Sequence, residues 1–171
     1  MGFLRYFTPD RMEKDIYCYP PSFFTERGID RVVFDIDNTV AAYDCALPSK
    51  RASSYLLSFK DEGIDVMLLS NNKPQRVEIF NAGMGFYAVA DAHKPSPKGI
   101  QRCLEQSSNK GRCAFVGDQI FTDCLAARRA GVYCFLVEPV QPVENLFFRF
   151  KRFCEKPFIR RYKRLLREGK I

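Results

Sequence analysis

The chain has 171 residues, 46% of them hydrophobic, which is the composition of one soluble globular domain with a proper core. No apolar run approaches the roughly 20 residues that a membrane-spanning helix needs, and the first residues lack the apolar region of a signal peptide. The seven cysteines are odd in number and contain no C-x-x-C pair, which excludes a disulfide framework and a zinc site of the usual spacing. We expect reduced cysteines and a cytoplasmic protein.

The formal net charge of +7 belongs to one end of the chain. Residues 1–145 hold 17 Lys and Arg and 18 Asp and Glu, whereas residues 146–171 hold 10 and 2. We therefore predict three parts, which are an N-terminal arm (1–30), a core (31–140) and a basic tail (141–171). The arm has many aromatic side chains and no clear period. We expect it to pack onto the core, and contact with a membrane surface or a partner is the alternative.

From residue 32 onward, apolar runs alternate with segments of helical spacing. The apolar runs predict strands that begin at residue 32 and then cover 64–70, 86–89, 113–117 and 132–137. Helical spacing predicts helices over residues 52–63, 73–83, 97–108 and 122–130. Such alternation is typical of βαβ units, so the expected class is α/β, a three-layer α/β/α Rossmann-like parallel sheet of about five strands. Ligands of such sheets bind outside the carboxyl ends of the strands.

Polar side chains with the chemistry of phosphoryl transfer follow four of these predicted strands. The set consists of Asp35, Asp37, Ser70, Asn71, Lys94, Asp118 and Asp123. Two carboxylates two residues apart on an extended segment point the same way, and they repel unless a cation or a proton lies between them. Mg²⁺, a hard ion that prefers oxygen ligands, is the expected cofactor. A carboxylate can act as nucleophile towards phosphorus, and a second acid can move the proton.

These four motifs, in this order, resemble those of the haloacid-dehalogenase superfamily of phosphatases. The resemblance covers about residues 30–140 and implies roles for the acids. Asp35 would be the nucleophile and a Mg²⁺ ligand. Asp37 would be the general acid and base, and its backbone carbonyl would be a further ligand. Asp118 would bind Mg²⁺ directly, and Asp123 would support the ion through water.

The resemblance also implies how the phosphate is held and how open the site is. Ser70 and the backbone of Asn71 would hold a phosphoryl oxygen, and Lys94 would neutralise the phosphorylated aspartate. Many members carry a cap domain inserted after the first or second motif. Here the 33 residues from Asp37 to Ser70 and the 24 from Ser70 to Lys94 suffice only for helices and strands of the core. We therefore expect no cap domain, and an open site that suits a phosphate on a bulky body such as a protein, a nucleic acid or a lipid head group.

The basic tail narrows the choice of partner. After Pro157, apolar side chains recur at helical spacing while most basic ones lie off that stripe. An amphipathic helix of this kind, over residues 146–171, can lie on an anionic membrane surface, and it can equally be a helix docked on the domain with a solvated basic face. RNA is a third and weaker possibility, because no RNA-recognition signature is present.

The compact size, the first motif F-D-I-D-N-T, the fourth motif G-D-Q-x-x-T-D and the Arg-rich tail are most similar to the capless YqeG-type branch. That branch is related to phosphatidylglycerophosphate phosphatases, so the resemblance implies this lipid as substrate and a peripheral place on the inner membrane face. Two alternatives stay open. The first is a soluble phosphatase for a sugar or nucleotide phosphate. The second is an RNA- or ribosome-associated binding protein that uses the basic tail.

Overall fold

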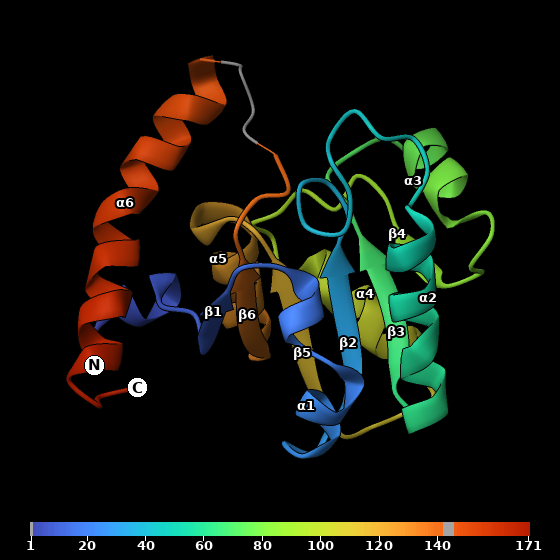
Figure 1. Ribbon diagram of the computed structural model, residues 1–171, viewed down its shortest axis with the longest axis horizontal. Helices are drawn as coiled ribbons and strands as arrows, with labels where there is room; N and C mark the ends of the chain where they lie inside the picture. Colours follow the sequence, from blue (N-terminus) through green and yellow to red (C-terminus); the bar gives the residue numbers. More distant parts are fainter. Residues whose placement is uncertain (1, 142–145) are drawn as a thin grey trace.

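The computed structural model describes residues 2–141 and 146–171, and a parallel β-sheet forms its centre (Figure 1). Its strands are β1 (Arg11–Glu13), β2 (Ile29–Asp35), β3 (Asp65–Leu69), β4 (Tyr87–Val89), β5 (Arg112–Gly117) and β6 (Tyr133–Val137). They lie in the order β1-β6-β5-β2-β3-β4, and every neighbouring pair is parallel. The α/β class predicted from the sequence is confirmed, and among the described residues the sheet has six strands where about five were predicted.

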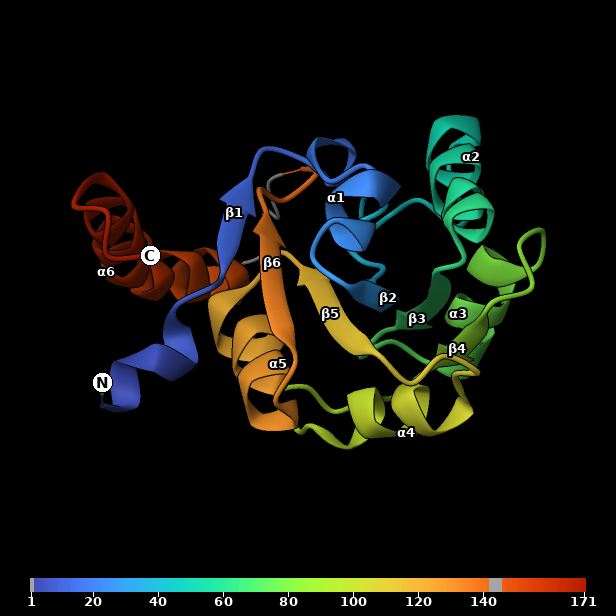
Figure 2. The same ribbon diagram turned by 90° about the horizontal axis from the view of Figure 1, so that it is seen from below.

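Helical segments connect the strands and cover both faces of the sheet. They are η1 (Phe3–Phe7), η2 (Ile16–Cys18), α1 (Pro21–Thr25), α2 (Lys50–Ser58), η3 (Phe59–Glu62), α3 (Pro74–Asn81), α4 (Lys98–Gln106), η4 (Ile120–Cys124), α5 (Leu125–Ala130) and α6 (Leu146–Arg167). Viewed from below, α1 and α2 lie on one side of the sheet and α4 and α5 on the other (Figure 2). None of the helices in the described ranges is long and apolar enough to cross a membrane.

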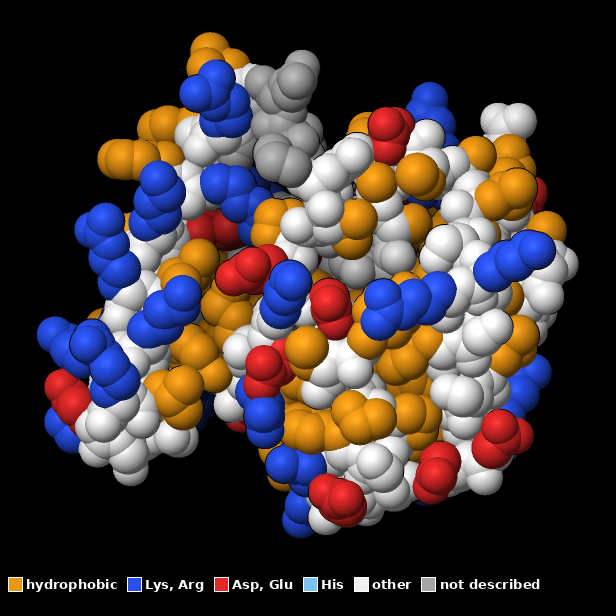
Figure 3. Space-filling view, viewed as in Figure 1, with side chains coloured by type: hydrophobic (Ala, Val, Ile, Leu, Met, Phe, Trp, Pro, Cys, Tyr) orange, Lys and Arg blue, Asp and Glu red, His pale blue; other side chains and the backbone are white. Residues whose placement is uncertain are grey.

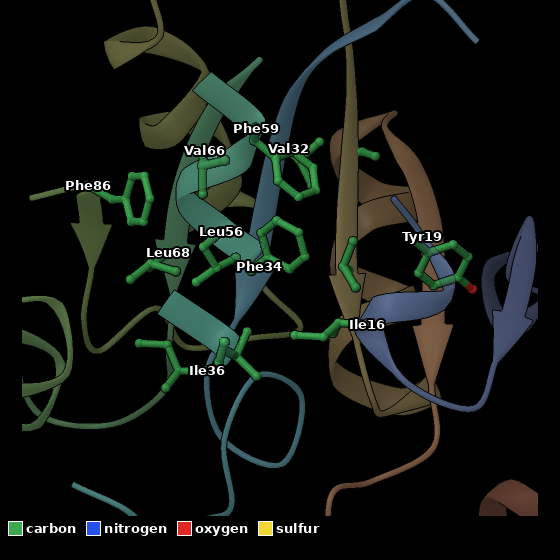
Figure 4. Close-up of a cluster of buried hydrophobic side chains, with 14 of the residues drawn as sticks. Ile16, Tyr19, Val32, Phe34, Ile36, Leu56, Phe59, Val66, Leu68 and Phe86 are labelled. Carbon is green, nitrogen blue, oxygen red and sulfur yellow. The ribbon is translucent and has the colours of Figure 1, made fainter. Parts of the chain in front are cut away.

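Strand β2 is central because its side chains are buried on both faces. Val32 and Phe34 point into the apolar cluster shared with α1, α2 and α3, and Val33 points into the cluster shared with α4 and α5. All three are fully buried. Side chains that alternate between two covered faces require the continuous apolar run seen in this strand. Around Phe34, buried aliphatic side chains from α2 and β3 and the Phe59 ring from η3 fill the first cluster (Figure 4).

The N-terminal residues add the sixth strand at the edge of the sheet. β1 pairs with β6, and on either side of this pairing the Asp10 amide donates to the Cys134 carbonyl at 2.8 Å, and the Tyr19 hydroxyl donates to the Leu136 carbonyl at 2.9 Å. Tyr19 is fully buried. Strand β1 has only three residues, and their exposure is mixed, so they form no periodic pattern of apolar side chains from which the strand could be predicted. The contacts are those of a segment packed onto the core.

Helix α6 begins eleven residues before Pro157, where the sequence suggested a helical stripe only after that proline. The stripe itself packs on the domain. The Phe158 ring lies 5.0 Å from the Phe7 ring and 5.4 Å from the Phe121 ring. The Tyr162 hydroxyl accepts a hydrogen bond from the Met12 amide at 3.0 Å. Proline in a helix removes one hydrogen bond, but α6 contacts the domain on both sides of Pro157, through Glu155 before it and Phe158 after it. For this part of the tail, the contacts support the docked-helix interpretation.

Asp65, the first residue of β3, ties the sheet to the segment that follows α4. One of its oxygens accepts hydrogen bonds from the Ser107 hydroxyl at 2.5 Å, the Ser108 hydroxyl at 3.0 Å and the Asn109 amide at 3.0 Å. Burial alone would raise the pKa of Asp65, but these donors hold it below its ordinary value of 3.8. The carboxylate therefore stabilises the fold above pH 3.8, and this contribution is lost as the pH falls through the lowered pKa of the folded state.

Asp65→Asn is accordingly expected to lower the free energy of unfolding at pH 7 by about 1–2 kcal/mol, which is at the low end of the values for hydrogen bonds to a charged group because Asp65 is only half-buried. Urea unfolding of both proteins at several pH values between 7 and 3 measures this. The gap should narrow below about pH 4, because the unfolded wild-type chain then takes up a proton at Asp65 that the folded carboxylate resists. A gap of constant size across that range would contradict the role of the charge.

Candidate active site

A tight turn after β2 carries the first pair of acids. Asp35 is the last residue of β2, and the next carbonyl, that of Ile36, accepts hydrogen bonds from three successive amides, of residues 39–41. Asn38 closes the turn with a positive φ of 63°, a conformation that Asn tolerates better than most residues. The Thr39 hydroxyl donates to Asp35 Oδ2 at 3.0 Å. The turn thereby fixes the orientation of a carboxylate that is only 3% exposed.

Lys94 joins the first acid pair to the second. Its ammonium contacts Asp35 Oδ1 and lies 2.8 Å from Asp123 Oδ1. Burial lowers the pKa of Lys94, but the two carboxylates outweigh burial and raise the pKa. The side chain of Asn71 holds the backbone of Lys94, because its Oδ1 accepts from the Lys94 amide at 2.7 Å and its Nδ2 donates to the Lys94 carbonyl at 3.2 Å. The sequence predicted a phosphate-binding backbone at Asn71, and this side-chain contact was not foreseen.

The carboxylate of Asp37 points to a different set of partners. Ser70 donates its hydroxyl to Asp37 Oδ2 at 2.8 Å, and Asn72 Nδ2 lies 3.4 Å from the same oxygen. Arg76 Nη2 donates to Asp37 Oδ1 at 3.3 Å. Ser70 is fully buried, so its hydroxyl is held in place beside Asp37. The sequence did not single out Arg76, since an arginine in the first turn of α3 carries no distinctive pattern.

The loop after β5 carries the second acid pair. Asp123 Oδ2 accepts hydrogen bonds from the amides of Asp118 and Gln119, both at 3.0 Å, so it closes the loop on itself. Asp118 is 3% exposed, and its Oδ1 is buried with no hydrogen-bond partner among the described residues. The loop also contacts α6, because Arg152 pairs with Asp118 Oδ2 and donates to the Asp118 carbonyl at 2.7 Å.

Oxygen atoms of Asp35, Asp118 and Asp123 lie within 4.8 Å of one another. Burial raises the pKa of Asp35 well above its ordinary value against the opposing charge of Lys94, and burial raises the pKa of Asp118 to about 7 against Arg152. At Asp123, burial is outweighed by Lys94 and by backbone amides, which hold its pKa below the ordinary value. Three buried carboxylates with an unpartnered oxygen are a ligand set that fits Mg²⁺. Of the four residues predicted as metal ligands, three form this triad. Asp37 was predicted to bind through its backbone carbonyl, and its carboxylate lies outside the triad.

Three charged side chains of α6 in the described part of the chain reach the segment after β5 and were not predicted, and one of them is Lys151, whose ammonium donates to Gln119 Oε1. Arg152 contacts Asp118 as described, and Arg152 Nη1 donates to Glu155 Oε2 at 2.9 Å. Glu155 Oε1 accepts from the amides of Ile120 at 2.9 Å and Phe121 at 3.3 Å. One signal could have revealed the contact, since Glu155 is the single acid within the strongly basic sequence of α6.

A parallel α/β sheet whose strand ends bring together two pairs of acids and a buried lysine defines a hydrolase of the phosphoryl-transfer class. A model of the haloacid dehalogenase-like hydrolases matches residues 21–131. The chain belongs to this family, and it is a phosphatase of the YqeG type.

Two individual proteins show the extent of the similarity. The chain is 31% identical over 161 residues to the "Probable phosphatase YqeG" of Bacillus subtilis (strain 168), which covers 94% of each chain. A crystal structure of an uncharacterized protein from Listeria monocytogenes serotype 4b has a TM-score of 0.50 and 16% identity. That match covers 68% of this chain and 85% of the other, and it supports the fold alone. The resemblance, the fold class and the phosphatase class predicted from the sequence are thus confirmed.

Proposed function

We propose that this phosphatase is Mg²⁺-dependent, works through an aspartyl-phosphate on Asp35, and converts phosphatidylglycerophosphate to phosphatidylglycerol. The observation that carries the chemistry is the division of the first acid pair. Asp35 lies beside Asp118, Asp123 and Lys94. Asp37 instead accepts hydrogen bonds from Ser70 and Arg76. Two neighbouring carboxylates in different surroundings can take different roles.

In the first step, an oxygen of Asp35 attacks phosphorus, a P–O bond to Asp35 forms, and the P–O bond to the alcohol breaks. Asp37 gives a proton to the departing oxygen, so the alcohol leaves neutral. Lys94, beside Asp35, balances negative charge on the phosphorylated side chain. Ser70 and the backbone of Asn71 hold a phosphoryl oxygen, for which the O–H bond of Ser70 rotates from Asp37 to the phosphate while the Ser70 oxygen stays in place.

In the second step, Asp37 takes a proton from water, and the water oxygen attacks phosphorus. The bond to Asp35 breaks, inorganic phosphate leaves, and both acids return to their starting state. Asp35, Asp118 and the backbone carbonyl of Asp37 would hold Mg²⁺, with Asp123 supporting the ion through water. When bound, the ion supplies positive charge to the phosphoryl oxygens.

The lipid substrate is supported by an open site and by the surface beside it. Between β2 and β3 the chain forms α2 and η3, and between β3 and β4 it forms α3, so no cap domain is inserted at either place. The first turns of α6 lie at the end of the molecule where β2 ends (Figure 1). Three apolar side chains are exposed there, because Leu146, Phe150 and Phe153 are 78%, 65% and 66% exposed.

Basic residues surround this apolar face. Lys and Arg side chains gather along α6, with hydrophobic side chains exposed near the beginning of the helix (Figure 3). Arg149 and Lys156 are exposed in the same turns. The side chains of Phe147 and Phe148 lie outside the described part of the structure. Exposed aromatic and basic residues on one helix suit an anionic lipid surface, so the proposed membrane contact is the beginning of α6.

A phosphate-release panel tests the substrate. We expect Mg²⁺-dependent release from vesicles that contain phosphatidylglycerophosphate, at a higher kcat/KM than from sugar phosphates, nucleotides or a soluble aryl phosphate. A preference for soluble esters with no release from the vesicles would defeat the lipid assignment and favour the soluble phosphatase. Salt-sensitive RNA retention without any hydrolysis would favour the binding protein.

The surface is tested by Phe150→Ser combined with Phe153→Ser. We expect kcat/KM on the lipid vesicles to fall about tenfold, which is less than full burial of two Phe side chains would provide, while the rate on the aryl phosphate stays unchanged. Leu166→Ser is the matched control, since Leu166 is 54% exposed on the same helix, about 20 Å further along. An equal fall in activity on the vesicles and on the soluble ester would mean that Phe150 and Phe153 stabilise the fold and do not bind the membrane.

A further inference from the structure

The beginning of α6 has a second face, which is turned inward and contacts the segment after β5 that carries Asp118 and Asp123. Arg152 is the centre of this contact. Its Nη1 donates to the Asp118 carbonyl at 2.7 Å and to Glu155 Oε2 at 2.9 Å, and its Nη2 pairs with Asp118 Oδ2. One planar guanidinium thus holds the main chain and the side chain of the same aspartate. A fixed fork of donors of this kind orients its partner, which a flexible ammonium cannot do as well.

The two oxygens of Asp118 are consequently in different situations. Oδ2 is engaged by Arg152, whereas Oδ1 is buried and has no hydrogen-bond partner among the described residues. The Asp118 side chain is fully buried beside Asp35 and Asp123. With Oδ2 held, the carboxylate cannot rotate freely, and Oδ1 stays available as the oxygen that a cation would take.

Glu155 holds the loop that follows. Its side chain is fully buried, and its Oε1 accepts the amides of Ile120 and Phe121, at 2.9 and 3.3 Å. A buried carboxylate is costly unless it is paired and hydrogen-bonded, and Glu155 has both kinds of partner in Arg152 and the two amides. Residues 118–123 cover the loop after β5 and the first residues of η4, so Arg152 fixes the beginning of this segment and Glu155 fixes the beginning of η4. Asp123 closes the same loop from the inner side.

We propose that Arg152 and Glu155 are positioning residues of the phosphatase, which hold Asp118 and its loop in the arrangement that binds the metal ion. The proposal rests on the function proposed above and deepens it. It makes α6 part of the active site, although the residues concerned are 34 and 35 positions from the loop in sequence. It also means that deleting residues 146–171 would disturb Asp118 and, at the same time, remove the proposed membrane-binding face at the beginning of α6.

Arg152→Ala, Arg152→Lys and Glu155→Gln test the proposal, and Arg160→Ala is the control, because Arg160 is an exposed arginine on the same helix. Mg²⁺ affinity is measured by calorimetry in the absence of substrate, and kcat and KM are measured on a soluble aryl phosphate. We expect Arg152→Ala to weaken Mg²⁺ affinity about tenfold or more and to lower kcat with little change in KM. Arg152→Lys should restore part of both, and Arg160→Ala should leave both unchanged.

Glu155→Gln keeps the shape of the side chain and one acceptor oxygen, so it gives a folded variant even if Arg152→Ala fails to fold. We expect a smaller loss of Mg²⁺ affinity from Glu155→Gln, in the same direction. Unchanged affinity and kcat in the folded variants, with only a lower Tm, would overturn the proposal and leave α6 as a structural support. Tighter Mg²⁺ binding in Arg152→Ala would also overturn it, since Arg152 would then compete with the ion.

The two proposals can fail separately. If the wild-type protein binds Mg²⁺ but hydrolyses no phosphate ester, the proposed function fails, and the affinities of wild type and variants still decide the positioning role. If the wild type is an active Mg²⁺-dependent phosphatase and the folded variants match it in affinity and kcat, the positioning role alone fails.

Discussion

Asp35→Asn is expected to lower hydrolysis of an aryl phosphate in the presence of Mg²⁺ by about 10³-fold or more, as loss of a nucleophile does in other enzymes. An amide oxygen is a poor nucleophile, and the substitution also removes the carboxylate that Lys94 and Thr39 contact. The rate is measured from released phosphate under initial-rate conditions. Circular dichroism shows whether the variant is folded.

Asp61→Asn is the matched control for this prediction. Asp61 is an exposed acid in η3, so its substitution should change the rate by less than twofold. Covalent labelling adds a direct test of the intermediate. Rapid acid quench after incubation with a substrate that carries a labelled phosphate should leave label on the wild type and none on Asp35→Asn. Undiminished turnover by the folded variant would exclude Asp35 as the attacking group.

Gly117→Ala is expected to lower both stability and activity. An added Cβ at Gly117 would lie 2.6 Å from Asp123 Cβ and 2.7 Å from Asp123 Cγ and Oδ2, which is closer than atoms can approach. Asp123 is 1% exposed and holds Asp118, Gln119 and Lys94, so its displacement disturbs the whole site. Forced shifts in a packed core cost about 1–3 kcal/mol, and a displacement of about 1 Å at a reacting centre can cost about 10²-fold in rate.

Chemical unfolding and phosphate release measure the two effects of Gly117→Ala. Gly83→Ala is the control, because Gly83 is exposed, has an ordinary φ, and has no atom within 4 Å of an added Cβ. We expect Gly83→Ala to leave activity unchanged and to change the free energy of unfolding by less than about 1 kcal/mol. A fully active Gly117→Ala would show that Asp123 can move without consequence, which is incompatible with its place in the site.

The acids and the lysine could be found in the sequence because each follows a predicted strand. In a parallel sheet the carboxyl ends of all strands lie at one edge, so side chains that follow different strands converge whatever the strand order. Asp35, Lys94, Asp118 and Asp123 meet for that reason. The residue types at those positions carry the chemistry, and the family resemblance identified the same set. Asp37 and Ser70 lie opposite each other for the same reason, because they follow the neighbouring strands β2 and β3.

Strand β1 and the role of α6 could not be predicted in this way. Both depend on contacts between residues that are far apart in sequence, and those contacts leave no periodic pattern. An arginine that pairs with a buried aspartate and an arginine that lies in solvent look alike in a sequence. The tail therefore read as a basic amphipathic segment, and Arg152 and Glu155 were counted with its other charges.

The sequence by itself thus determined the α/β class, the phosphatase chemistry and the side chains at the strand ends, because local periodicity and the geometry of parallel strands are enough for these. Only the tertiary structure decided which side of α6 faces the domain. That choice depends on burial of the Phe158 and Tyr162 side chains and on partners for the buried charge of Glu155. It turns Arg152 towards Asp118 and leaves Phe150 outside, so one short stretch of helix meets both the proposed metal site and the proposed lipid surface.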